Sequence, residues 1–231
     1  MPVLLIVGSG PGISFATAAR FGAEGYTVAL VGRDADRLDA VAARLSDAGI
    51  EARGYVGDAT DAGEIRSIVA AVRQDLGAIT VVLFTAFGTA SVRNVLTVDP
   101  VVALDPFRLG VVGLLTTVQA SLDDLRSQAG AAIIVATGAV GENIAEINQF
   151  ATHADLDGLA LEAAGKSKLL GLLAERLRDD DVYVGEIVIN GTVLGSPYAS
   201  PTAIDPARVA DLFWSMTGAR DTSRSFLAEV S

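Results

Sequence analysis

The sequence predicts an α/β protein with a doubly wound parallel sheet, helices on both faces, and a single domain over residues 1–231. Three observations support this prediction. Short β-rich runs alternate with longer helical patterns, as in successive βαβ units. The runs are continuously apolar rather than alternating, which is typical of strands covered on both faces. A length of 231 residues suits one domain with a large core.

Six strands and six helices are expected in alternation along the chain. Each helical segment has apolar residues at spacings of three and four, which indicates one buried face. The expected strands are Val3–Val7, Tyr26–Val31, Ala52–Val56, Ile79–Phe84, Ala131–Ala136 and Val182–Ile189. The expected helices span residues 12–24, 34–48, 61–76, 100–128, 155–178 and 206–217.

The least regular segments follow the fourth, fifth and sixth expected strands, at residues 85–99, 138–154 and 190–205. Ligands of open α/β sheets bind outside the carboxyl ends of the strands. We therefore expect a small-molecule substrate at these three loops.

The composition excludes several classes of function. Apolar residues make up 51% of the chain, which is too many for a disordered protein. The net charge of -11 repels phosphate backbones and anionic lipids, so we expect neither nucleic acid nor a membrane as a partner. The chain has no cysteine, so it has no thiolate nucleophile, and we expect no metal site. No segment has the pattern of a signal peptide or a membrane-spanning helix, so a cytoplasmic protein is expected.

A glycine-rich loop, Gly8-Ser9-Gly10-Pro11-Gly12-Ile13-Ser14, joins the first strand to the first helix. Missing side chains let backbone N–H groups approach a pyrophosphate at the positive end of a helix. The spacing G-x-G-x-x-G fails because its third glycine would be Ile13, whereas G-x-x-x-G fits Gly8 and Gly12. The alternative is an ordinary tight turn between a strand and a helix.

Three further segments accompany this loop: Val28-Ala29-Leu30-Val31-Gly32-Arg33-Asp34, Gly57-Asp58-Ala59-Thr60-Asp61 and Phe84-Thr85-Ala86-Phe87-Gly88. In this order and at these distances, the four segments resemble the short-chain dehydrogenase/reductase family over nearly the whole chain. The resemblance implies a Rossmann-like fold, a nicotinamide cofactor, and a homodimer or homotetramer that pairs the helices at 100–128 and 155–178.

The resemblance also assigns residues to parts of the cofactor. Gly8, Ser9, Gly12 and Ile13 would form the pyrophosphate loop. Asp58 and Ala59 would contact the adenine, and Thr85 and Ala86 would lie beside the adenosine ribose. Thr192, in Asn190-Gly191-Thr192-Val193, would donate a hydrogen bond to the nicotinamide carboxamide. Downstream, Pro197, Tyr198, Pro201 and Ile204 would form a substrate lid.

The end of the second strand indicates which cofactor is preferred. A carboxylate there binds the ribose 2'-hydroxyl of NAD, whereas an arginine pairs with the 2'-phosphate of NADP. Gly32 holds the first position and Arg33 follows, which favours NADP(H) over NAD(H). The alternative is that Asp34 holds Arg33 in an ordinary turn.

The catalytic residues of the family, Asn, Ser, Tyr and Lys, are not retained. The asparagine position falls at Gly110 and the serine position at Gly138, next to Thr137. No Tyr-x-x-x-Lys occurs, although both lysines of the chain, Lys166 and Lys168, lie in the helix that normally carries this motif.

Four residues are candidates for rebuilt chemistry. Lys166 in the lysine position puts Glu162 where the tyrosine belongs, although counting back from Asn190-Gly191 places that position nearer Ala163. A surface ion pair is the alternative for residues four apart on a helix. His153, the one histidine, could transfer a proton or lie solvated in its loop. Thr137 could orient a carbonyl or simply end its strand.

Three functions fit this sequence. The first is an NADP-dependent oxidoreductase with a rebuilt proton-transfer group, acting on a small carbonyl or alcohol. The second is a non-redox enzyme on the same fold, an isomerase, dehydratase or cyclase that uses His153 or Glu162. The third is a non-enzymatic NADP(H)-binding protein.

Overall fold

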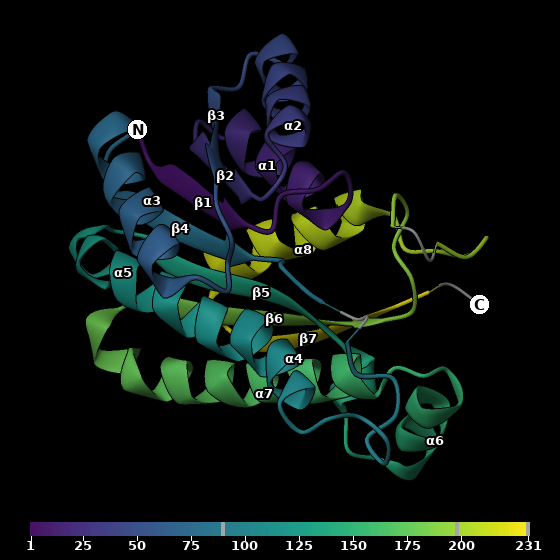
Figure 1. The fold of residues 1–231 in the computed structure, drawn as a ribbon. Coiled ribbons are helices and arrows are strands. Elements are labelled where there is room, and N and C mark those ends of the chain that lie inside the picture. The colour runs from purple at the N-terminus through teal and green to yellow at the C-terminus, as the bar shows by residue number, and fades with distance from the viewer. Residues whose placement is uncertain (89–90, 197–198, 230–231) are drawn as a thin grey trace.

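The computed structural model describes residues 1–88, 91–196 and 199–229, and it contains one parallel sheet of seven strands (Figure 1). The strand order, β3-β2-β1-β4-β5-β6-β7, confirms the predicted doubly wound topology. The strands are β1 (Val3–Val7), β2 (Thr27–Gly32), β3 (Ala52–Val56), β4 (Ile79–Phe84), β5 (Ala132–Gly138), β6 (Tyr183–Asn190) and β7 (Arg224–Ala228).

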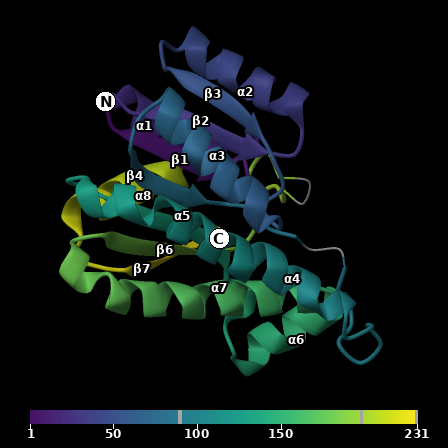
Figure 2. The same ribbon diagram turned by 60° about the vertical axis from the view of Figure 1, so that its left-hand side comes forward.

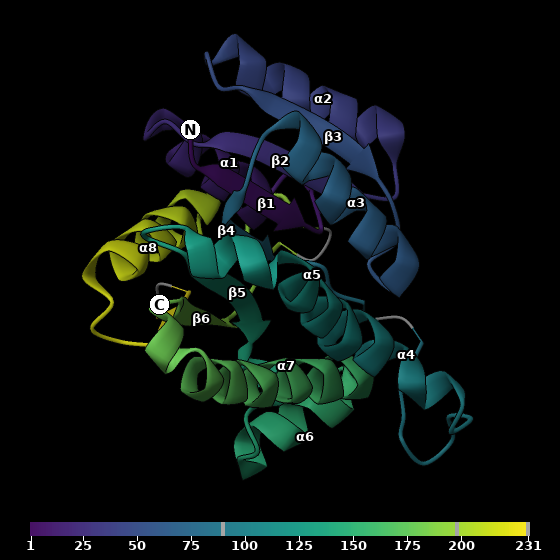
Figure 3. The same cartoon turned by 90° about the vertical axis from the view of Figure 1, so that its left-hand side faces the viewer.

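Two helical layers cover the sheet, because the central strands present apolar side chains to both faces (Figure 3). One face packs against α1 (Ile13–Ala23), α2 (Ala35–Asp47) and α8 (Pro206–Ala219). The opposite face packs against α3 (Ala62–Asp75), α5 (Leu114–Ser127) and α7 (Asp157–Arg176). No helix in the described part of the chain is both long enough and apolar enough to cross a bilayer.

The structure corrects the element boundaries in three places. Residues 138–154, expected to be irregular, contain α6 (Ala145–His153), which lies beside α7 (Figure 2). β7 was not expected, and it adds a parallel edge strand to β6. The long helix expected at 100–128 is interrupted: a 3-10 turn (Val102–Leu104), α4 (Asp105–Phe107) and a π-helical turn (Arg108–Gly113) precede α5.

The parallel arrangement brings the carboxyl ends of the central strands together. After β1, the amides of Gly8 and Ser9 donate to Val31 O of β2, both at 3.0 Å. After β4, the amides of Thr85 and Ala86 donate to Val7 O of β1, at 2.9 and 3.1 Å. The glycine loop is thus fixed between the ends of the two neighbouring strands.

Candidate functional site

The glycine loop packs directly on the segment that follows β4. Gly8 has a φ of +99°, and a Cβ there would overlap the backbone of Thr85 and Ala86. The Thr85 hydroxyl donates to Gly8 O at 3.0 Å. A side chain at position 8 would therefore separate two loops that the resemblance assigns to one cofactor.

The first turn of α1 is open toward this loop. Gly12 caps the helix without a side-chain hydrogen bond, whereas Asp34, Asp61 and Asp205 cap α2, α3 and α8. The Ser9 hydroxyl is buried and has no hydrogen-bond partner among the described residues. Free N–H groups at a helix N-terminus beside an unpaired hydroxyl fit the pyrophosphate of a dinucleotide.

Arg33 follows the end of β2. The position before it, where a carboxylate would bind the ribose of NAD, is Gly32. Arg33 is exposed, and a Cβ on Gly32 would meet Leu38 in ordinary contact at 3.5 Å. Asp34 does not hold Arg33 within the described structure. Its carboxylate accepts from the Arg37 amide at 3.1 Å and lies 3.9 Å from the Arg37 guanidinium.

The expected adenine contact, Asp58, forms a local turn after β3. Its carboxylate accepts from the amide and the hydroxyl of Thr60, at 2.8 and 2.9 Å. The next residue, Ala59, presents its carbonyl to Gly113, where an added Cβ would come within 2.6 Å. Both residues lie at the same edge of the sheet as the glycine loop.

Glu162 and Lys166 form a buried ion pair on α7. Lys166 Nζ lies 3.0 Å from Glu162 Oε1, and the two side chains are 4% and 0% exposed. The second carboxylate oxygen accepts from the Gly88 amide at 3.0 Å, and Lys166 also donates to Ala86 O at 3.4 Å. The pair therefore lies against the loop that follows β4, and not on the surface.

The space for the Glu162 carboxylate comes from a glycine in the π-helical turn. A Cβ on Gly110 would overlap Cγ of Glu162. Position 110 is where the resemblance places the asparagine of the family. A glycine at 110 and a glutamate at 162 are therefore matched, because the carboxylate fills the volume that a side chain at 110 would need.

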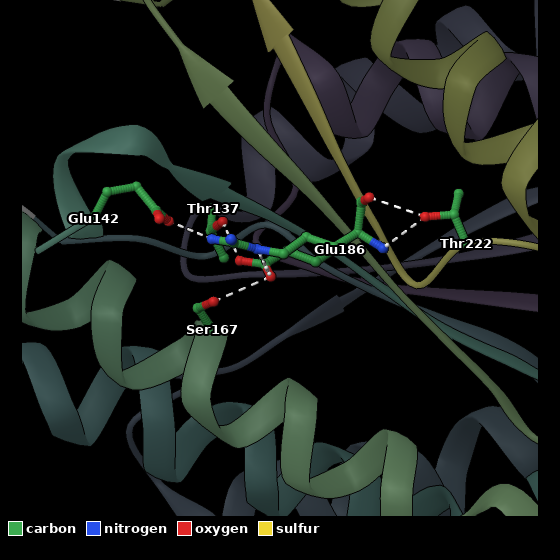
Figure 4. Close-up of polar contacts among 6 residues, drawn as sticks. Thr137, Glu142, Ser167, Glu186 and Thr222 are labelled. Atoms are coloured by element: carbon green, nitrogen blue, oxygen red, sulfur yellow. Dashed lines mark hydrogen bonds and ion pairs between the residues drawn. The ribbon is translucent and has the colours of Figure 1, made fainter. Parts of the chain in front are cut away.

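Thr137 belongs to a second buried polar cluster, on the face of the sheet that α7 covers (Figure 4). Its hydroxyl donates to Glu186 Oε1 at 2.6 Å. The other oxygen of Glu186 accepts from Ser167 at 3.1 Å and from Arg224 Nε at 2.8 Å. Arg224 also pairs with Glu142, and the two carboxylates raise the pKa of its guanidinium against the opposing effect of burial.

His153 lies at the exposed end of α6. Its ring Nδ1 is 2.7 Å from the carbonyl of Gln149, one turn earlier in the same helix. The structure thus brings Glu162 and Lys166 together, and it places Thr137 and His153 in separate surroundings.

Thr192 is engaged by a residue that the sequence did not single out. Its amide and its hydroxyl donate to Glu229 Oε1, at 2.6 and 2.7 Å. These bonds, with those from Thr202 and Ser200, lower the pKa of Glu229 to about 2. No motif flags Glu229, because it is distant in sequence and follows the unpredicted strand β7.

The segment after β6 folds over the glycine loop. A Cβ on Gly12 would meet Leu194 O at 3.5 Å, in ordinary contact. Ile204 is buried, and its backbone forms hydrogen bonds with the backbone of Thr192 and Leu194. Of the other expected lid residues, Pro201 is exposed, and Pro197 and Tyr198 lie outside the described residues. No group of His, Asp or Glu side chains in the described part of the chain has the geometry of a metal site.

Known proteins resemble this chain in sequence and in fold. The family model for short chain dehydrogenases matches residues 2–152. A peroxisomal 2,4-dienoyl-CoA reductase of Arabidopsis thaliana is 35% identical over 86 residues, which cover 37% of this chain and 29% of that protein. Oxidoreductase asL5 of Sarocladium schorii is 32% identical over 135 residues, which cover 58% of this chain and 52% of that protein. The matched segments thus span about half or less of these relatives.

The fold is shared over nearly the full length with a solved short chain oxidoreductase of Pseudomonas aeruginosa PAO1, described as NADPH-bound with an atypical catalytic center. Its TM-score is 0.84 at 21% identity, over 99% of this chain and 95% of that one. The strand order, the glycine loop and the match over residues 2–152 agree. The chain belongs to the short chain dehydrogenase family.

Proposed function

We propose that this protein is an NADP(H)-dependent oxidoreductase for a small carbonyl or alcohol, in which Glu162 and Lys166 form the proton-transfer group. The observation that supports this most is the buried ion pair itself, with Lys166 Nζ 3.0 Å from Glu162 Oε1. The pair lies under the segment after β4, on the helix and at the spacing where the family carries its tyrosine and lysine.

The cofactor residues support the choice of NADP(H). The open first turn of α1 and the unpaired Ser9 hydroxyl fit a pyrophosphate, and exposed Arg33 fits a 2'-phosphate. Gly32 brings no carboxylate to repel that phosphate. When bound, this cofactor would supply or accept the hydride. The relative from Pseudomonas aeruginosa is described as NADPH-bound with an atypical center, which adds support by analogy.

In the ion pair the transferable proton is on the Lys166 ammonium, and the Glu162 carboxylate accepts from it. As the hydride is delivered to the carbonyl carbon, Lys166 would pass a proton to Glu162 and Glu162 would pass one to the carbonyl oxygen, which leaves an alcohol. The amide of Gly88 would hold the Glu162 side chain in place, and Lys166 would regain its proton from water. Because residues 86–88 cover the pair, substrate would reach Glu162 only after this segment moves.

A second candidate function is supported by one specific observation. Glu162 is 0% exposed, which suits an ion pair that fixes the loop after β4 in a non-enzymatic NADP(H)-binding protein. Such a protein would keep the cofactor residues and have no turnover.

The two candidates are separated by following NADPH absorbance with a panel of small aldehydes and ketones. The oxidoreductase proposal expects turnover that falls about a hundredfold in Glu162→Gln, because a general acid is lost, while NADPH affinity is retained. Lys166→Met and Lys168→Met form a matched pair: the first loses a buried partner of Glu162, and the second, two residues later and exposed, serves as the control. NADPH binding without turnover on any substrate would support the binding protein instead.

We also propose that the protein is a homodimer or homotetramer. On the two helices expected at the interface, Leu114, Val118 and Leu170 are buried within one chain. Val112 and Leu172 remain 46% and 53% exposed and are available for contact between chains. Light scattering at micromolar concentration tests this proposal, and a monomer would overturn it.

A further inference from the structure

The carboxylate of Glu229 is held by four donors from the segment that follows β6. The Thr192 amide and hydroxyl donate to Oε1 at 2.6 and 2.7 Å, and the Ser200 hydroxyl donates to the same oxygen at 3.1 Å. The Thr202 hydroxyl donates to Oε2 at 2.6 Å. Glu229 is half-buried, and its carboxylate oxygens accept from all four of these donors, which a carboxylate has the lone pairs to do.

The backbone around Glu229 leaves room for its side chain. Gly191 has a φ of +137°, and a Cβ there would overlap Cγ of Glu229. The Glu229 amide also donates to Asn190 O at 3.2 Å, so the main chain and the side chain are both fixed. The tail after β7 can therefore lie on the end of β6 only because residue 191 has no side chain.

Through Ser200 and Thr202, Glu229 also holds residues 192–196 and 199–204 in place, where they contact the glycine loop. Ser200 N donates to the Thr192 hydroxyl at 2.9 Å, and Ile204 N donates to Thr192 O at 2.8 Å. In this position Leu194 O and Gly195 lie against Pro11 and Gly12. Glu229 thus holds the segment closed over the loop that fits the pyrophosphate.

We propose that Glu229 is an intramolecular latch that competes with the cofactor for Thr192. The inference rests on the proposed function, in which Thr192 donates to the nicotinamide carboxamide. One oxygen of Glu229 occupies both donors of Thr192, so the carboxamide oxygen and the carboxylate exclude each other there. The negative charge of the latch also repels the phosphates of the dinucleotide. Cofactor binding therefore includes the release of Glu229 from Thr192.

The opposite role makes the opposite prediction. If Glu229 only stiffens the segment in its cofactor-binding shape, then its removal weakens binding, because the segment must be ordered when the cofactor arrives. A latch instead lowers the affinity for the cofactor, so removal of Glu229 raises that affinity.

The test is an equilibrium titration of the cofactor-free protein with NADPH, followed by nicotinamide fluorescence. Glu229→Gln keeps the shape of the side chain and removes its charge, and Glu229→Ala removes every acceptor in case the glutamine still binds Thr192. Glu175→Gln is the control, because it removes the same charge from an exposed position on α7. Thermal unfolding checks that each variant is folded.

The latch predicts that Glu229→Gln binds NADPH about tenfold more tightly than the parent protein, and that Glu175→Gln binds it equally. Unchanged or weaker binding in both Glu229 variants overturns the latch and leaves the proposed function in place. If no protein binds NADPH, the cofactor assignment and the latch both fail. Hydrogen exchange provides a second readout without cofactor: the Thr192 amide should exchange faster in Glu229→Ala, and unchanged protection there contradicts the latch.

Discussion

The buried side chain of Glu162 fits in the structure because residue 110 is a glycine. Gly110 lies in a π-helical turn, where a Cβ would overlap Glu162 Cγ. The sequence predicted the Glu162–Lys166 spacing and the two glycines at the asparagine and serine positions. It could not predict that the carboxylate is fully buried, because burial depends on the turn around 110 and on the loop at 86–88, which are distant in sequence.

Gly110→Ala should destabilise the protein by about 1–3 kcal/mol, as expected for a side chain forced into a filled core. In an ordinary helix the same change would be stabilising by up to about 1 kcal/mol. Gly171→Ala is the control, since a Cβ at that position in α7 meets no atom within 4 Å. Urea unfolding measures both variants. A Gly110→Ala protein as stable as the parent would contradict the close packing of Glu162.

Arg33→Ala should weaken NADPH binding tenfold to a hundredfold, roughly the 1.5–3 kcal/mol of a hydrogen bond between charged groups. NADH lacks the 2'-phosphate, so its affinity should stay the same. Arg66→Ala, an exposed arginine on α3, controls for the change in net charge. Equal loss of NADPH and NADH affinity would show that Arg33 does not read the 2'-phosphate.

At the scale of elements, α7 connects the candidate site to the edge of the sheet. Glu162 and Lys166 face the loop after β4, and the next residue, Ser167, donates to Glu186 on β6. Arg224 on β7 completes this cluster by pairing with Glu186 and Glu142 (Figure 4). Sequence analysis missed the cluster because its central carboxylate lies within an apolar strand and its cation lies on a strand that was not expected.

Arg224→Ala should lower the free energy of unfolding by about 2 kcal/mol. Removal of the cation leaves Glu186, whose side chain is 5% exposed, with an uncompensated charge. The guanidinium is itself 35% exposed, so the loss should be smaller than for a fully buried pair. Arg208→Ala on α8 is an exposed control. Chemical unfolding gives the comparison, and equal stability of the two variants would rule out a structural role for the Arg224 pairs.

At the scale of the whole molecule, apolar runs predicted β1 to β6 and the doubly wound class of the sheet. Those runs are visible in the sequence because helices cover both faces of each central strand. α6 and β7 were not predicted because they are mostly exposed. α6 has one buried residue, Ala151, and Phe226 of β7 is 58% exposed. Peripheral elements bury too little apolar surface to leave a clear pattern.

The free energy of unfolding should fall in strong alkali, because two tyrosines, Tyr55 and Tyr183, lose their protons there. Burial raises the pKa of Tyr55 and of Tyr183 to about 12, with the carboxylates of Asp75 and Asp221 adding to the shift. An unfolded tyrosine loses its proton near pH 10. The stabilising contribution is therefore complete below pH 10 and is lost as the pH rises toward 12. Ultraviolet titration checks this, and two ordinary tyrosine transitions near pH 10 from residues 55 and 183 would contradict it.

The central claim is that the fold holds NADP(H), and the most direct measurement is a titration of the parent protein with NADPH and, separately, NADH. Nicotinamide emission is the better signal, because Trp214 packs on Phe21, away from the glycine-loop end of α1. NADPH should bind at least tenfold more tightly than NADH, a difference of about 1.4 kcal/mol. Failure of both cofactors to bind at hundreds of micromolar would show that the fold does not hold NADP(H).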